Sequence, residues 1–134
     1  MRDAMKQRGF TLLELLGILM ILGLIILITY PIVRSLIINT RKKAVTDSIY
    51  NYVRLVESVI AKDATENPGE THTGTYTIEG KKIVRLDGTD TLLIPAKGTY
   101  PTGTMEIEKR VVQSATFQLD RFELTYDGKK VKVK

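Results

Sequence analysis

The chain has 134 residues, of which 43% are hydrophobic and 26% charged, and its formal net charge is +5 at neutral pH. It contains no cysteine, which excludes disulfide bonds, thiol catalysis and cysteine metal sites. The pI of 9.5 raises nucleic acid as a partner. However, acids are interleaved with the basic residues and no nucleic-acid-binding motif occurs, which favours a mixed, solvated surface.

An apolar segment begins close to the N-terminus. The first nine residues are basic on balance and end in Gly9, and from Leu15 to Ile28 every residue is apolar or glycine. The stretch 10–30 would span about 30 Å as a helix, the thickness of a bilayer core. A cleavable secretory signal would have a shorter apolar region ending in a small-residue cleavage site, which is absent. The segment therefore predicts a membrane-spanning helix. Basic residues on both sides of it leave the orientation open.

The helical pattern resumes after Pro31. Apolar residues recur three and four positions apart, at Val45, Ile49, Tyr52, Val53, Val56 and Ile60. This spacing predicts an amphipathic helix that ends near 62–65, before the breaker-rich sequence ENPGETHTG. Pro31 would kink the long helix or mark a local break. We expect residues 10–33 to form the transmembrane or filament-core helix and 34–64 its amphipathic half.

The segment 65–134 reads as a small antiparallel sheet. Hairpins are expected at Glu79-Gly80 and at Asp127-Gly128, and a bulge or turn at 120–121. Pro95 confines its strand to an edge or to a short length. Four lysines in the last six residues indicate an edge strand whose charges prevent pairing with another chain. The predicted fold class is α+β, a long N-terminal helix packed on a small C-terminal sheet.

The sequence KQRGFTLLELL joins a basic leader, a glycine, a phenylalanine and an acid at the fifth position after the glycine. It resembles the class III signal of type IV prepilins and pseudopilins. The matching residues are Gly9, Phe10 and Glu14, and the likeness covers about the first 30 residues. The rest of the chain is similar to that family only in architecture.

The resemblance implies that a prepilin peptidase removes the leader 1–9 by cutting after Gly9 and then methylates the amino group of Phe10. It also implies a cytoplasmic leader and an outward-facing C-terminal domain. A cytoplasmic ATPase and an inner-membrane platform protein would then draw subunits from the bilayer into a helical filament. In related filaments the stretch between a glycine and a proline, here Gly23 to Pro31, loses helical structure.

Glu14 is expensive in hydrocarbon when it is unpaired, by roughly 3 kcal/mol on insertion scales. This cost favours assembly, in which Glu14 could pair with the amine of Phe10 on the adjacent subunit or on its own. Such a pair is better understood as a device that sets register than as a source of stability. Gly9, which has no side chain, would let the scissile bond enter a narrow protease site.

The leading interpretation is a structural subunit of a type IV pilus-like filament, and not an enzyme. Its partners would be copies of itself and related pilins, the peptidase, the platform protein and the membrane. It would lie in the cell membrane before assembly and in a surface pilus or pseudopilus afterwards. The alternative is a single-pass anchored binding domain that does not polymerise. Whether the system serves a pilus, competence or secretion stays open.

No cofactor, metal site or catalytic residue is expected. His72 is the sole histidine and falls in a predicted loop, so we assign it no metal or catalytic role. Asp87, Gly88 and Asp90 loosely resemble a calcium loop, but the spacing of an EF-hand fails. DNA contact by the C-terminal lysines is possible but unsupported.

Overall fold

The computed structural model describes residues 9–95 and 97–134, which divide into two compact units between Asn39 and Thr40. Helix α1 (Leu12–Glu66) supplies most of the first unit and continues into the second. It ends at Glu66, one residue beyond the predicted range of 62–65 for its end. The helix is uninterrupted at Pro31, so the local break considered from the sequence does not occur in the single chain.

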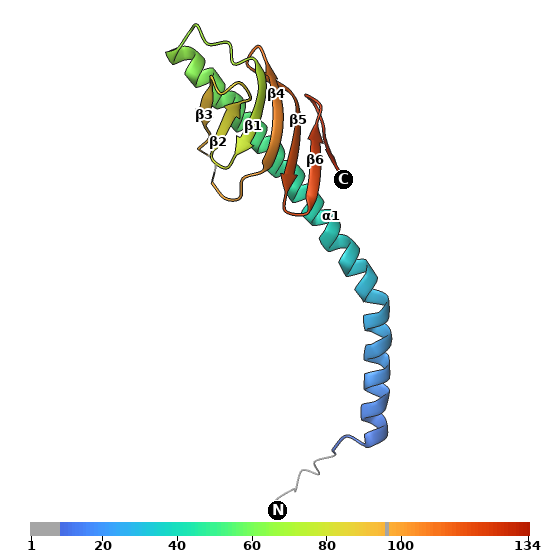
Figure 1. Ribbon diagram of the computed structural model, residues 1–134. Helices are drawn as coiled ribbons and strands as arrows, with labels where there is room; N and C mark the ends of the chain where they lie inside the picture. The colour runs from blue at the N-terminus through green and yellow to red at the C-terminus, as the bar shows by residue number, and fades with distance from the viewer. Residues whose placement is uncertain (1–8, 96) are drawn as a thin grey trace, which may run out of the picture. The chain divides into compact units, whose positions relative to one another are not determined.

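The C-terminal unit contains an antiparallel sheet, which has seven strands among the described residues and the spatial order β3-β2-β1-β4-β5-β6-β7 (Figure 1). The strands are β1 (Gly74–Glu79), β2 (Lys82–Arg85), β3 (Thr91–Leu93), β4 (Thr102–Glu108), β5 (Val111–Leu119), β6 (Phe122–Tyr126) and β7 (Val131–Val133). Both predicted hairpins are present. The turn at 120–121 joins β5 to β6, and β3 is an edge strand that ends before Pro95. The predicted α+β class is confirmed.

One face of the sheet packs on the second half of α1 (Figure 1). The predicted stripe on α1 supplies five buried residues: Ile49, Tyr52, Val53, Val56 and Ile60. Side chains from β1 to β6 meet them, and the Phe117 ring on β5 contacts Tyr52 edge-on, with 6.0 Å between centroids. Burial of these apolar groups is what holds the helix to the sheet.

The β6–β7 hairpin turns at Asp127, whose Oδ1 accepts hydrogen bonds from the backbone N–H groups of Lys130 at 2.8 Å and Lys129 at 3.2 Å. These bonds stabilise the ionised carboxylate and lower the pKa of Asp127 below its ordinary 3.8. The contribution of Asp127 to stability is therefore present above that value and is lost as the pH falls through the folded-state pKa.

We expect the hairpin of the parent chain to loosen as the pH is lowered from about 5 to about 2, because protonation of Asp127 weakens its bonds to the two amides. Asp127→Asn is expected to lose this acid dependence, since an amide oxygen accepts the same bonds without titrating. Amide chemical shifts and hydrogen exchange at Lys129 and Lys130 measure the effect. Equal acid responses in the two chains would contradict the assignment.

Candidate functional site

The start of α1 is closed by a reciprocal pair of hydrogen bonds between Thr11 and Glu14. The backbone N–H of Glu14 donates to Thr11 Oγ1 at 3.2 Å, and the backbone N–H of Thr11 donates to Glu14 Oε2 at 3.1 Å. The Thr11 hydroxyl also donates to Oε2, at 3.3 Å. This is a capping box, in which Thr11 is the N-cap and Glu14 the third helical residue. Glu14 therefore has hydrogen-bond partners within its own chain.

Because the capping box sets the helix start at Leu12, the Gly9–Phe10 peptide bond lies outside α1. Both residues are exposed. A Cβ atom built on Gly9 would meet no atom within 4 Å. The fold of this chain therefore tolerates a side chain at position 9, and a requirement for glycine there has to come from a partner that holds this segment.

The helix that follows offers an apolar surface that the chain itself leaves uncovered. Every residue from Gly9 to Ala44 is exposed, including Phe10 at 78% and Leu12 at 87%. Among the described residues, α1 is the one helix long and apolar enough to cross a membrane. So much exposed apolar surface is unstable in water and calls for lipid or for other helices.

Two further residues singled out from the sequence lie inside this helix. Gly23 has no neighbouring atom within 4 Å of a built Cβ, and its surroundings in the single chain therefore do not demand a glycine. Pro31 lacks the backbone N–H that would bond to the carbonyl of Leu27, which is four residues earlier. The helical ladder thus has a missing bond at Pro31, although the helix continues.

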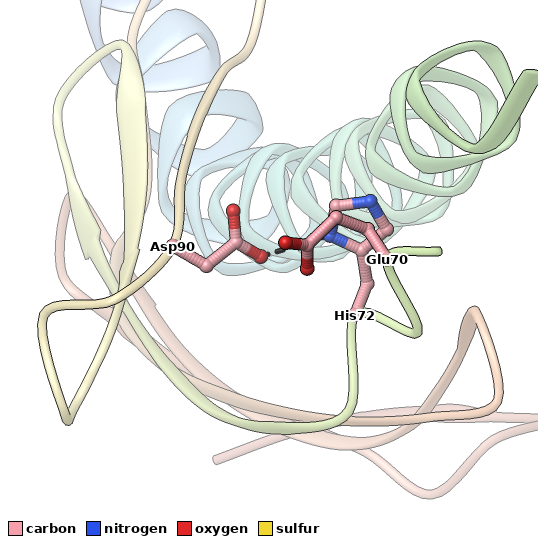
Figure 2. A group of neighbouring side chains, drawn as sticks. All are labelled: Glu70, His72 and Asp90. Carbon is pink, nitrogen blue, oxygen red and sulfur yellow. Dashed lines mark hydrogen bonds and ion pairs between the residues drawn. The ribbon is translucent and has the colours of Figure 1, made fainter. Parts of the chain in front are cut away.

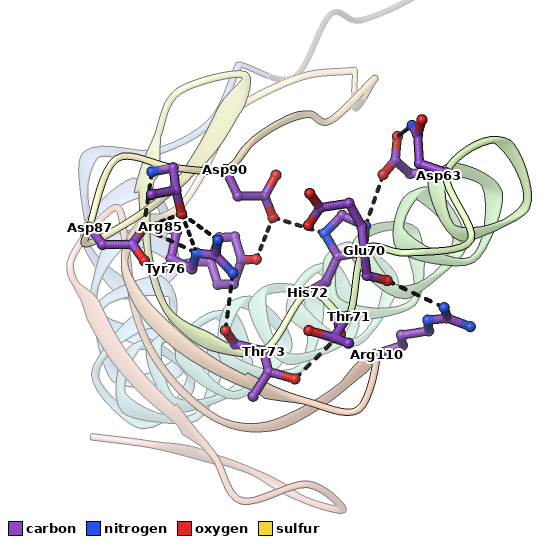
Figure 3. Close-up of polar contacts among 12 residues, drawn as sticks. Asp63, Glu70, Thr71, His72, Thr73, Tyr76, Arg85, Asp87, Asp90 and Arg110 are labelled. Atoms are coloured by element: carbon purple, nitrogen blue, oxygen red, sulfur yellow. Dashed lines mark hydrogen bonds and ion pairs between the residues drawn. The ribbon is translucent and has the colours of Figure 1, made fainter.

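A second polar cluster lies in the C-terminal unit, where the predicted loop residue His72 is fully buried. Its Nε2 is 2.9 Å from Asp63 Oδ2 in the last turns of α1. Its Nδ1 is 2.8 Å from Asp90 Oδ2, in the loop that leads into β3 (Figure 3). His72 thus connects the end of the helix to the sheet.

The Tyr76 hydroxyl on β1 donates to the same oxygen of Asp90. Burial disfavours the charged form of Asp90, but the hydrogen bond from Tyr76 and the close contact with His72 outweigh it and lower the pKa of Asp90. Burial, together with the bond to Asp90, raises the pKa of Tyr76 above its ordinary 10.0. Asp90 is therefore a carboxylate at neutral pH and Tyr76 a neutral donor.

Glu70 lies in the loop between α1 and β1, beside His72 (Figure 2). One potential ligand atom from each of Glu70, His72 and Asp90 lies within 4.8 Å of the others, close enough for the three to share a metal ion. Asp87, which the sequence placed in a loose calcium-like loop with Asp90, points elsewhere. Its carboxylate accepts from Arg85 Nε at 3.0 Å.

Comparison with known families finds a match over residues 4–30 to the prokaryotic N-terminal methylation motif. The chain carries this methylation motif. It is the class III signal peptide of type IV pilins, so the resemblance seen in the sequence is confirmed for this segment. No curated protein and no solved structure matches the chain.

The methylation motif indicates a type IV pilin-like precursor, and it points to a structural protein and away from an enzyme. It implies processing by a prepilin peptidase and assembly with other pilins. Together with the long apolar helix, it fits anchoring in a membrane before assembly. Most of the leader 1–9 lies outside the described residues, so the described geometry of the motif begins at Gly9.

Sequence reasoning missed two features of these sites. The pattern Thr11-x-x-Glu14 ahead of an apolar run is itself the signature of a capping box, and could have been recognised. The burial of His72 had no comparable signal. Its partners Asp63 and Asp90 are 9 and 18 residues away, and only the fold brings them together.

Proposed function

We propose that this chain is a structural subunit of a type IV pilus-like filament, made as a membrane-anchored precursor. The observation that carries the proposal is the methylation motif placed directly before an exposed apolar helix. The helix would serve first as the anchor and then as part of the filament core. Its uncovered surface supports both uses, since lipid tails and neighbouring helices bury apolar side chains equally well.

Each residue of the processing site has a proposed role. The peptidase cuts after Gly9, which leaves Phe10 as the first residue and its amino group as the site of methylation. The exposed, non-helical backbone at these two residues suits cleavage, because a protease needs an extended chain. Cleavage leaves the capping box of Thr11 and Glu14 intact, and so the mature helix keeps its start.

In the filament, Glu14 is proposed to face the methylated amine of Phe10 on an adjacent subunit. Its own carboxylate already accepts hydrogen bonds from Thr11, but these bonds leave its negative charge uncompensated. A neighbouring cation would supply that compensation and fix the register of the subunits. The stretch from Gly23 to Pro31 would lose its helical structure on assembly, starting from the hydrogen bond already missing at Pro31.

The proposal divides the chain into a leader, 1–9, a core helix, 10–33, an amphipathic half, 34–64, and a sheet domain, 65–134. The leader would lie in the cytoplasm and the sheet domain outside the membrane. Beyond the peptidase, the assembly partners would be an inner-membrane platform protein and a cytoplasmic ATPase. The mature chain would reside in a surface pilus or pseudopilus.

The experiment that tests assembly expresses the chain together with a prepilin peptidase, a platform protein and an assembly ATPase. Filaments sheared from the cells are expected to contain the chain with Phe10 at its N-terminus. A matched culture without the ATPase should hold the same processed chain in the membrane fraction. A processed chain that stays in the membrane in both cultures would overturn the filament proposal, and it would favour an anchored domain that does not polymerise.

A further inference from the structure

The cluster around His72 brings three carboxylates to one buried imidazole. Asp63 comes from the end of α1, Glu70 from the loop after it, and Asp90 from the loop before β3 (Figures 2 and 3). Two guanidinium groups lie near the cluster. Arg85 Nε donates to Asp87, and Arg110 donates to the backbone carbonyl of Glu70 at 3.3 Å. The three carboxylates outnumber these two cations, so the cluster holds an excess of negative charge next to a group with no exposed surface.

In its neutral form, His72 has one ring nitrogen without a hydrogen that faces a carboxylate oxygen. A neutral imidazole carries a hydrogen on only one ring nitrogen. When Nε2–H donates to Asp63, the lone pair of Nδ1 faces Asp90 Oδ2 at 2.8 Å. Two lone pairs at that distance repel unless a proton or a metal ion bridges them, and a carboxylate oxygen of Glu70 lies within 4.8 Å of ligand atoms of His72 and Asp90.

We propose that Glu70, His72 and Asp90 bind a divalent first-row transition-metal ion such as Zn²⁺. The ion would bind His72 through Nδ1 and the two acids through their carboxylate oxygens. Asp63 would accept from Nε2–H and fix the tautomer of His72, and the Tyr76 hydroxyl would hold the Asp90 carboxylate. Such a shell of outer hydrogen bonds is typical of metal-binding histidines.

The donor set favours this class of ion. Imidazole nitrogen is a ligand for zinc and its neighbours, whereas calcium and magnesium take oxygen ligands. With metal–ligand bonds of about 2.0–2.2 Å, donors 2.8 Å apart subtend nearly a right angle at the ion, so His72 Nδ1 and Asp90 Oδ2 would move apart slightly around a tetrahedral ion. Glu70 is exposed, and its ligand atom lies within 4.8 Å of those of His72 and Asp90.

A dication also compensates more of the negative charge of the three carboxylates than a proton does. A proton shared with Asp63 and Asp90 would leave the charge of Glu70 uncompensated, because Glu70 has no ion-pair partner among residues 9–95 and 97–134. A bound dication would compensate two of the three carboxylate charges. It would tie the loop after α1 to the loop before β3.

The test titrates ZnCl₂ into the full chain in detergent, prepared without a polyhistidine tag, and follows binding by calorimetry. We expect one Zn²⁺ per chain and much weaker binding of CaCl₂. Glu70→Gln, at an exposed position, should fold normally and bind Zn²⁺ about tenfold or more weakly. Asp63→Asn should lose roughly 10- to 100-fold in affinity. The matched control Glu66→Gln removes an exposed acid outside the cluster and should bind as the parent does.

Because His72 is the sole histidine, its ¹⁵N signals report the site without ambiguity. Zinc is expected to shift Nδ1 and to leave Nε2 protonated. The proposal is overturned if Zn²⁺ does not saturate at one site, if Ca²⁺ binds as tightly, or if Glu70→Gln matches Glu66→Gln. It is also overturned if both ring nitrogens stay protonated at neutral pH in the presence of zinc. None of these outcomes bears on the filament proposal.

Discussion

Filament yield is expected to fall about tenfold or more in a Glu14→Gln variant that is still processed after Gly9, because the amine it would meet in the filament is left without its counter-charge. Glutamine keeps an oxygen that can accept from the Thr11 N–H, so the capping box survives and only the charge is removed. The measurement compares sheared filaments with the processed chain left in the membrane fraction.

Thr11→Ala is the matched control, since it removes the capping hydroxyl and keeps the carboxylate. Loss of an N-cap costs about 1 kcal/mol of helix stability, a small effect for a helix of this length. We expect Thr11→Ala to make filaments close to the parent level. If Thr11→Ala abolishes filaments and Glu14→Gln does not, then Glu14 acts through the helix cap, and the pairing with Phe10 is wrong.

Gly103→Ala is expected to be the most destabilising single-methyl change in the sheet. Gly103 lies on β4 with φ of +143°, and a Cβ built there would lie 1.9 Å from the backbone oxygen of Thr116 on β5. Strain at such a φ costs about 1–3 kcal/mol, and overpacking against a backbone about as much again. We therefore expect the free energy of unfolding to fall by roughly 2–6 kcal/mol.

Gly80→Ala is the control that distinguishes the cost of a positive φ from the cost of the steric clash at Gly103. Gly80 also has a positive φ, +61°, but a built Cβ meets nothing within 4 Å. Its cost should be about 1–2 kcal/mol, from the left-handed conformation alone. Urea unfolding of both variants in the full chain, followed by near-ultraviolet circular dichroism, makes the comparison. Equal losses for the two would contradict the close approach of β4 and β5 at Gly103.

Much of the fold follows from patterns that act locally along the chain. The three- and four-residue spacing from Val45 to Ile60 predicted the buried stripe of α1, since that stripe is what one side of a helix presents. The turns at Gly80 and Gly128 were predicted because positive φ is what tight hairpins require and glycine allows. The ends of the strands were harder to predict from the sequence. The break at Lys109 and Arg110, both with positive φ, separates β4 from β5, and no glycine marks it.

The two candidate sites also differ in whether local sequence is enough to predict them. The methylation motif is contiguous, so its leader, glycine and acid could be recognised without a fold. The cluster at His72 is assembled by the docking of α1 on the sheet, which carries Asp63 to the loops that hold His72 and Asp90. Burial was also invisible in advance, because a single polar residue in a glycine- and threonine-rich loop predicts exposure.

The most direct test of the central proposal, a precursor that is processed between Gly9 and Phe10, is mass spectrometry of the chain. The chain is recovered from membranes of cells that contain a prepilin peptidase, and parallel cells without the peptidase serve as the control. We predict a mature chain that begins at Phe10 and carries one added methyl group on its amine, and an intact leader in the control. An intact N-terminus in both, or cleavage at another bond, would contradict the proposal.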